Sequence, residues 1–302
     1  MLEKIGIILE LLNNEWKTNS FKKNEKNYIK AFTALHVIEI TQLGIDYYDT
    51  IELKDISDEK FYFYTYGIFQ SFFGQTEAAK SLLSSILNIS NIKTQFRVMY
   101  PELQSIVDKR NNAVGHPTDR TLNGKISFHE IYPPEFSGKQ ITLYNKFSLL
   151  ENEHTEINIV ELVYLQKKHI NLILDEIIVK LKSEIMKHNK KFHNIKLLNL
   201  LPPTTNYLIS NLLIENCNNG KYKASFETLH KIYIEIKKGM NDRYDESHSW
   251  ETLFSTLDFI FEKLGKEISG MEKRVYAIAL KTSIGQLKEL LKSVDMDFSK
   301  KI

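Results

Sequence analysis

Residues 108–118, DKRNNAVGHPT, combine side chains that can cleave RNA without a metal ion. The imidazole of His116 titrates near neutral pH, so it can take up or release a proton. The guanidinium of Arg110 is a permanent cation whose planar fork suits a phosphate. His116 would deprotonate a ribose 2′-hydroxyl, and Arg110 would stabilise the charge on the pentavalent phosphate that follows. The product would be a 2′,3′-cyclic phosphate, and DNA would resist cleavage because it lacks the nucleophile.

The spacing of the two side chains restricts how they can meet. On a continuous α-helix, six positions at about 100° each place His116 roughly 120° around the helix from Arg110. Two arrangements would bring them together, and they are compatible. The helix can end at Gly115, or the segment can meet its own copy across a twofold axis.

The same residues resemble the signature of a known family. Arg110-Asn111 followed by His116 resembles the R-x(4–6)-H motif of the HEPN superfamily (higher eukaryotes and prokaryotes nucleotide-binding), and GHPT at 115–118 resembles a bacterial version of it. The segments 66–83 and 161–181 resemble helices before and after the motif in that group. The resemblance therefore covers roughly residues 28–195.

The resemblance implies an α-helical bundle that is usually dimeric and, in many members, a metal-independent endoribonuclease. Such members often act as toxins or in defence against phage, and other members only bind RNA or form dimers. Carried over by position, Arg110 and His116 would be the catalytic pair, and Asn111 would orient one of them or the phosphate. The implied partners are RNA, a second copy of the chain, and an antitoxin or defence-system protein. No cofactor or metal is implied.

Three alternatives stay open for this segment. Arg110 can pair locally with Asp108 or Glu102 while His116 merely stops a helix. The groove of a dimer can hold RNA, a nucleotide or a partner protein without cutting. The aromatic helix 61–73 can make a dimer in a protein that serves interaction alone, although an aromatic stripe is more often a buried core.

Other candidate residues have simpler interpretations. His188 and His193 are five residues apart, whereas paired helical metal ligands prefer four, so we expect a solvated helix face rather than a metal or RNA site. His36 and Glu39 share a helix face and predict a buried, hydrogen-bonded pair. Cys217 has no basic neighbour closer than Lys221 and is expected to be inert. A hydrated loop is favoured over a divalent-ion site for the polar cluster Asp242, Asp245, Glu246 and His248.

Composition limits the class of protein. With 302 residues the chain predicts two domains, and 12 Gly and 6 Pro leave little material for the turns of a sandwich or barrel. The net charge of +2 argues against a nucleic-acid grip along the whole chain but not against a local basic patch. A single cysteine excludes an internal disulfide and a thiolate zinc cluster. No signal peptide or membrane span is predicted, so we expect a cytoplasmic protein.

Hydrophobic periodicity predicts an all-α fold, a HEPN-like helical bundle with a small β-hairpin insertion, followed by a C-terminal helical module. Residues 18–27 are expected to form a loop, Ser57 an N-cap, and Pro101 a kink or a fresh helix start. The Pro202-Pro203 pair puts the domain boundary near 196–204, between domains 1–197 and 203–302. The expected helices are 1–16, 28–48, 58–88, 94–114, 157–193, 205–215, 220–238, 248–264 and 270–293, and the expected hairpin, near 122–150, pairs strands 125–132 and 140–149.

Overall fold

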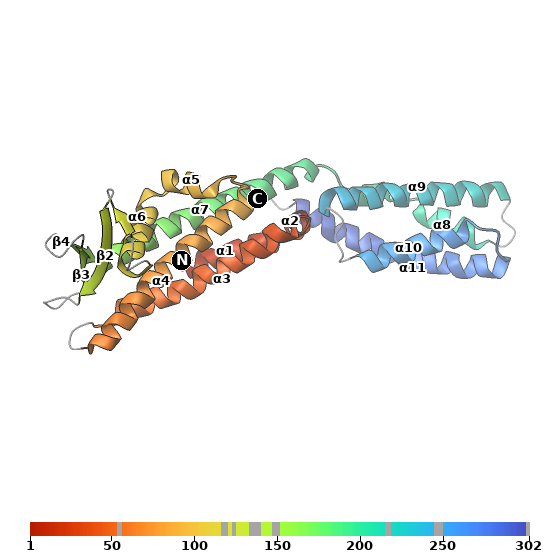
Figure 1. Ribbon diagram of the computed structural model, residues 1–302. Coiled ribbons are helices and arrows are strands. Elements are labelled where there is room, and N and C mark those ends of the chain that lie inside the picture. The colour runs from red at the N-terminus through yellow and green to blue at the C-terminus, as the bar shows by residue number, and fades with distance from the viewer. Residues whose placement is uncertain are drawn as a thin grey trace. The chain divides into compact units, whose positions relative to one another are not determined.

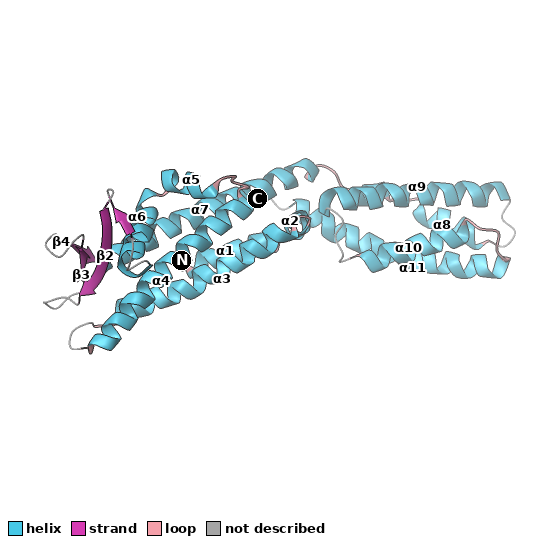
Figure 2. Ribbon diagram, viewed as in Figure 1, coloured by secondary structure: helices cyan, strands magenta, loops and turns pink. Residues whose placement is uncertain are grey.

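The protein is seen in a computed structural model that describes residues 1–52, 56–115, 120–122, 125–132, 140–146, 152–214, 219–244 and 250–299. Helices dominate the described chain, and a small antiparallel sheet is inserted among them (Figures 1 and 2), which confirms the predicted fold class. The chain divides into two compact units. The first comprises residues 1–12 and 24–181, and the second comprises residues 13–23 and 182–302.

The first unit is built on the long helices α3 (Glu25–Thr50) and α4 (Asp58–Ile86). They run antiparallel, because Gly44 lies against Ser71 while Thr41 lies against Gly74. Apolar side chains on one side of each helix are buried, such as Leu35 of α3 and Phe69 of α4, and so is Ile170 in the first part of α7 (Ile159–Phe192). The remaining helices of the unit are α1 (Leu2–Leu12), α5 (Ile92–Met99) and α6 (Pro101–Arg110), followed by a π turn, η1 (Asn111–Gly115).

A chain of buried amides fixes α3, α4 and α7 in register. The Gln75 side chain donates to Gln42 Oε1 at 3.2 Å, and the Gln166 side chain donates to Gln75 Oε1 at 3.0 Å. All three side chains are buried, and a buried amide without partners is costly. The amides therefore oppose sliding of one helix past another.

The sheet has four antiparallel strands in sequence order: β1 (Arg120–Leu122), β2 (Lys125–Tyr132), β3 (Gln140–Lys146) and β4 (Asn152–Asn158). Strands β2 and β3 confirm the predicted hairpin, with Ile131 opposite Leu143. Strand β4 was not predicted, because its sequence NEHTEIN has a single apolar residue, Ile157, and shows no alternation. Ile157 pairs with Ile141, and both are buried.

The helix boundaries follow local chemistry. Pro101 is the first residue of α6, after a break at Tyr100, which confirms the predicted fresh start. Ser57 occupies the N-cap of α4 as predicted, although its side chain makes no capping hydrogen bond to the backbone. The predicted loop at 18–27 is wrong. Residues there belong to α2 (Glu15–Lys22) and the start of α3, and each helix has an N-cap asparagine, Asn14 or Asn24, whose side chain accepts a backbone N–H.

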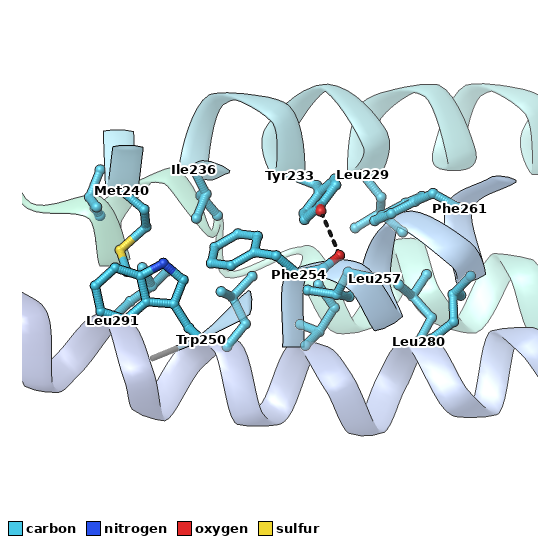
Figure 3. Packing of buried hydrophobic residues seen from close by; sticks show 14 of the residues in the cluster. Leu229, Tyr233, Ile236, Met240, Trp250, Phe254, Leu257, Phe261, Leu280 and Leu291 are labelled. Carbon is cyan, nitrogen blue, oxygen red and sulfur yellow. Dashed lines mark hydrogen bonds between the residues drawn. The ribbon is translucent and has the colours of Figure 1, made fainter. Parts of the chain in front are cut away.

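The second unit contains α2, the end of α7 and the short 3₁₀ helix η2 (Leu197–Leu200), together with α8 (Thr205–Leu213), α9 (Asn219–Tyr244), α10 (Glu251–Leu264) and α11 (Gly270–Ser299). The four helices predicted after Pro203 are thus confirmed. Figure 3 shows their core, where the Tyr233 hydroxyl donates to the Phe254 carbonyl at 3.1 Å. Burial raises the pKa of this hydroxyl, so it remains a donor at any physiological pH.

The division between the units differs from the expected one. It lies inside α7, between residues 181 and 182, and residues 13–23 belong to the second unit. The cause is packing around His188, whose ring stacks on Trp16 at a centroid distance of 4.0 Å. Lys17 also forms an ion pair with Glu184 at 2.5 Å. Pro202-Pro203 therefore lies in the connection between η2 and α8, inside the second unit, rather than between two units.

Candidate functional site

Arg110 is the last residue of α6, and two elements fix its guanidinium. Nη1 donates to Asn111 Oδ1 at 3.0 Å, and Nη2 donates to Gln70 Oε1 at 2.9 Å. The guanidinium carbon lies 4.4 Å from the centre of the Phe73 ring, close enough for a cation–π contact. Gln70 and Phe73 are three residues apart on α4, so both reach the same side of that helix. The cation is therefore held in one orientation by α4 and by its own neighbour.

The hydrogen-bond partners of Arg110 are neutral amides, which leaves its charge without a carboxylate counterpart at these contacts. Asp108 accepts instead from Gln104 at 3.1 Å, and Glu102 lies 3.8 Å from His169. In these contacts Arg110 therefore pairs with neither Asp108 nor Glu102, which was the alternative considered from the sequence. The Nε atom of Arg110 is also buried, and it has no hydrogen-bond partner among the residues that the structure describes. The guanidinium retains both charge and donor capacity for an anion.

The chain leaves Arg110 through the π turn η1. A π turn links residues five apart and winds less tightly than an α-helix, and such turns occur frequently at functional sites. Within η1, Ala113 is buried, and Asn112 Oδ1 is a buried acceptor that no described residue donates to. His116 lies outside the described residues, so its position relative to Arg110 stays a prediction. Of the three predicted site residues, Arg110 and Asn111 are described, and a hydrogen bond joins their side chains.

The aromatic segment 61–73 is only partly a core helix. Phe61, Phe69 and Phe72 are buried, as the core interpretation predicts. Phe63 is 76% exposed and Tyr66 is 46% exposed. These two precede Gln70 by seven and four residues, so they form a stripe along α4 that ends at the Arg110 site.

Gln70 and Phe73 were missed in the sequence analysis. They lie 40 and 37 residues before Arg110, and neither has a residue type that suggests chemistry. The only signal was a glutamine on the polar side of an otherwise aromatic helix segment. That signal gains meaning once α4 and α6 are known to pack against each other.

The other candidates are placed differently from the expectations. His188 is buried, and its Nε2 lies 2.6 Å from the Arg243 carbonyl, so the expected solvated face is wrong for this residue. His193 is exposed, as expected. His36 and Glu39 are exposed and 3.8 Å apart, so the expected buried pair is wrong as well.

Several expectations fall partly on residues that the structure does not describe. Cys217 and residues 245–249 of the polar cluster lie outside the described residues, and Asp242 is exposed at the end of α9. Among described residues, no group of three or more His, Cys, Asp or Glu side chains is arranged to hold a metal ion. No helix in the described ranges combines the length and apolar character needed to cross a membrane.

Comparison of the chain with protein-family models, with curated proteins and with solved structures gave no match. The resemblance to HEPN proteins therefore rests on the motif and its flanking segments alone.

Proposed function

We propose that this chain is a metal-independent endoribonuclease of the HEPN type, acting as a homodimer. The observation that carries the proposal is Arg110, whose guanidinium is fixed by two amides and an aromatic ring and faces no carboxylate in its hydrogen bonds. The π turn leads directly from this arginine to His116. A prearranged cation beside a titratable imidazole is what cleavage through a 2′-hydroxyl requires.

Each residue has a separate role in the proposed reaction. His116, as general base, takes the proton from the 2′-hydroxyl, and the oxygen attacks the adjacent phosphorus while the bond to the 5′-oxygen of the next nucleotide breaks. The protonated His116 then acts as general acid and gives a proton to that departing 5′-oxygen. Arg110 stabilises the phosphorane charge, and an already oriented donor costs no reorganisation at the moment of reaction. Asn111 accepts a hydrogen bond from Nη1 of Arg110 at 3.0 Å and so helps to hold the orientation of the guanidinium. It is thus a positioning residue.

The outer face of α4 is the proposed contact between two copies. Phe63, Gln70, Gly74 and Ser81 follow one another at helical spacing on this face. Phe63 protrudes at one end, and a groove of about 710 Å³ between α3 and α4 opens at the other end, beside Gly74 and Ser81. A twofold axis near Gln70 would seat each Phe63 in the groove of the other copy. The same axis would bring two Arg110 side chains to one interface.

A cytoplasmic RNA-cutting enzyme of this kind would act as a toxin or a phage-defence effector. Its activity would need restraint by an antitoxin or a defence-system partner. The runner-up is a non-catalytic module that holds RNA at the same groove, in which Arg110 binds phosphate and no bond is broken.

The experiment is cleavage of single-stranded RNA by purified full-length protein in excess EDTA. We expect cut products with 2′,3′-cyclic phosphate ends, identified by mass spectrometry. His116→Ala and Arg110→Ala should each lower the rate by about 100-fold or more, in line with the loss of an acid/base group or of a prearranged donor. The matched control is Arg97→Ala, which removes an exposed arginine of α5 and should leave the rate unchanged.

Two results would overturn the proposal in different ways. Cleavage that survives His116→Ala would exclude the assigned chemistry. Intact RNA together with a mobility shift that Arg110→Ala abolishes would favour the non-catalytic binding module.

A further inference from the structure

The strands β2, β3 and β4 carry a row of aromatic side chains that the proposed reaction does not use. Successive side chains of a strand point to opposite faces of a sheet. The buried apolar residues of these strands mark the inner face: Ile131, Leu143 and Ile157. Tyr132, Tyr144 and His154 are an odd number of residues away from them and therefore project from the outer face.

Strand pairing brings the three rings next to one another. Tyr144 is directly opposite His154, and their ring centroids are 6.0 Å apart. Tyr132 is diagonal to Tyr144, and these two centroids are 5.0 Å apart. Neighbouring strands are about 4.8 Å apart, so a row across three strands spans roughly 10 Å. Aromatic side chains arranged in this way on an antiparallel sheet stack two or three RNA bases in a common class of RNA-binding domain.

All three rings have accessible surface in the single chain. Tyr132 is 45% exposed, His154 is exposed, and Tyr144 between them is partly exposed. The Tyr132 hydroxyl donates to Glu130 at 2.8 Å, which helps to fix the orientation of its ring. A ring that is already ordered loses little conformational freedom when a base stacks on it, so the row is prepared for a flat ligand.

The charges on the outer face favour bases over phosphates. Glu130 and Glu156 each lie two residues from a member of the row, so they share its face. A carboxylate repels a phosphate group, but it accepts hydrogen bonds from the exocyclic amino group of a base such as cytosine. A single strand on this face would therefore turn its bases toward the sheet and its phosphates away from it.

The sheet lies beside the elements that hold Arg110, at the same end of the first unit as α6 (Figure 1). Strand β2 contacts the π turn η1, which follows Arg110 directly. The Tyr62 hydroxyl of α4 also donates to the Ile131 carbonyl at 3.3 Å. Tyr62 precedes Gln70 by eight residues, which is about 12 Å along the helix. A single strand can therefore extend from the row to Arg110 over a few nucleotides.

We propose that Tyr132, Tyr144 and His154 form a stacking platform for unpaired bases of single-stranded RNA next to the cleavage site. The choice of RNA rests on the proposed function. The platform would hold nucleotides that flank the scissile bond and would take no part in proton transfer. It would favour unpaired segments over duplex RNA, whose bases already stack on one another.

The test removes bases from the strand and rings from the protein in one cycle of binding measurements. The probe is a fluorescent single strand of about six nucleotides with 2′-O-methyl sugars, which cannot be cut through a 2′-hydroxyl. A second strand has abasic sites at its central positions and keeps every phosphate. Tyr132→Leu with Tyr144→Leu should weaken binding of the complete strand by about 30-fold or more, for two lost stacking contacts. The abasic strand should bind the wild type and this variant equally.

Two matched variants separate stacking from other effects. Tyr132→Phe with Tyr144→Phe keeps both rings, so it should bind the complete strand as the wild type does, although the hydroxyl group that donates to Glu130 is gone. Tyr207→Leu removes a tyrosine of α8 that is 60% exposed and should leave the affinity unchanged. The comparison of the two strands on the wild type needs no variant, so it tests the platform even if the Leu double variant does not fold.

Two results would overturn the platform. Equal affinity of the wild type for the complete and the abasic strand would mean that sugars or phosphates carry the binding. A folded Leu double variant that loses the abasic strand as strongly as the complete strand would mean that the rings do not contact bases.

The outcome is separable from that of the cleavage assay, because neither strand can be cut. If base removal and ring removal are coupled while cutting survives His116→Ala, the platform stands and the assigned chemistry fails. If His116→Ala abolishes cutting while the two removals are independent, the assigned chemistry stands and the platform fails.

Discussion

Two arginines of this chain show how the same side chain serves opposite purposes. Arg110 is half-buried, and its hydrogen bonds to Asn111 and Gln70 go to neutral amides. Arg243 is fully buried and donates to Asp295 at 2.8 Å, with the Phe298 ring 5.0 Å from its guanidinium carbon. The charge of Arg243 is neutralised by Asp295. The same carboxylate accepts hydrogen bonds from the backbone N–H groups of Leu197 and Leu198, so this ion pair helps to hold the second unit together. The charge of Arg110 remains available to a ligand.

At the residue scale, the account predicts a positioning role for Gln70. Gln70→Leu removes the acceptor that holds Nη2 of Arg110, and a hydrogen bond to a charged group contributes about 1.5–3 kcal/mol. We expect kcat for RNA cleavage to fall about tenfold or more, with a smaller change in KM, because the cation loses its orientation in the transition state. Gln70 is exposed, so the thermal midpoint should change little.

The control for this variant is Gln104→Leu, which removes a glutamine whose side chain donates to Asp108 within α6. It should leave kcat unchanged. An unaltered kcat in Gln70→Leu would mean that the orientation of Arg110 does not depend on α4.

At the element scale, the sequence predicted those helices whose apolar residues recur regularly, and it missed those whose ends depend on polar side chains. The regular pattern of α3, α4 and α7 located them within a few residues. The short helix α2 has few apolar residues and depends on packing of Trp16 against His188. The pairing of β4 with β3 is likewise a tertiary contact that no local pattern reports.

The residues of the candidate site likewise fall into those that the sequence identified and those that only the tertiary structure revealed. Arg110 and Asn111 were found because they are adjacent in the sequence and have side chains with obvious chemistry. Gln70 and Phe73 come from another helix and could be identified only after α4 and α6 were seen to pack. A motif in sequence thus locates the charge, and the fold determines what orients it.

The outer face of α4 provides a prediction at this scale. Phe63→Lys should shift the protein from dimer to monomer in size-exclusion chromatography with light scattering. It places a charge where the proposed twofold contact buries an aromatic ring, and unpaired buried charge is costly. The fold should be unaffected, since Phe63 is 76% exposed in the single chain. RNA cleavage should fall with dimer content.

Val98→Lys is the matched control, because Val98 is 80% exposed on α5 and lies outside the proposed contact. It should remain dimeric. A monomeric wild type, or a Phe63→Lys variant that stays dimeric, would contradict the placement of the contact on α4.

At the scale of the whole molecule, the near-neutral total charge conceals two units of opposite sign. The total charge argues against nucleic-acid binding along the entire chain, but it does not report the charge of either unit alone. The chain length predicted two domains, and the structure has two compact units. The boundary between them differs from the predicted one near 196–204, because the second unit includes residues 13–23 and the end of α7.

This boundary predicts the behaviour of fragments. A fragment of residues 203–302 lacks the backbone N–H groups of Leu197 and Leu198 that Asp295 accepts, and it lacks the Leu197 side chain that packs on Gly239. We expect it to unfold without a cooperative transition in urea, followed by circular dichroism. A fragment of residues 182–302 retains these contacts and should unfold cooperatively. Equal cooperativity of the two fragments would argue against the observed division.

The most direct test of the account is whether cleavage needs the 2′-hydroxyl at the cut site. A single-stranded RNA is first cut by the wild-type protein in EDTA, and its main cleavage position is mapped. The same RNA is then made with one 2′-deoxynucleotide on the 5′ side of that bond. The account predicts that cutting at this position disappears while cutting elsewhere continues, because the attacking oxygen has been removed from one site only. Continued cutting at the deoxy position would contradict the account.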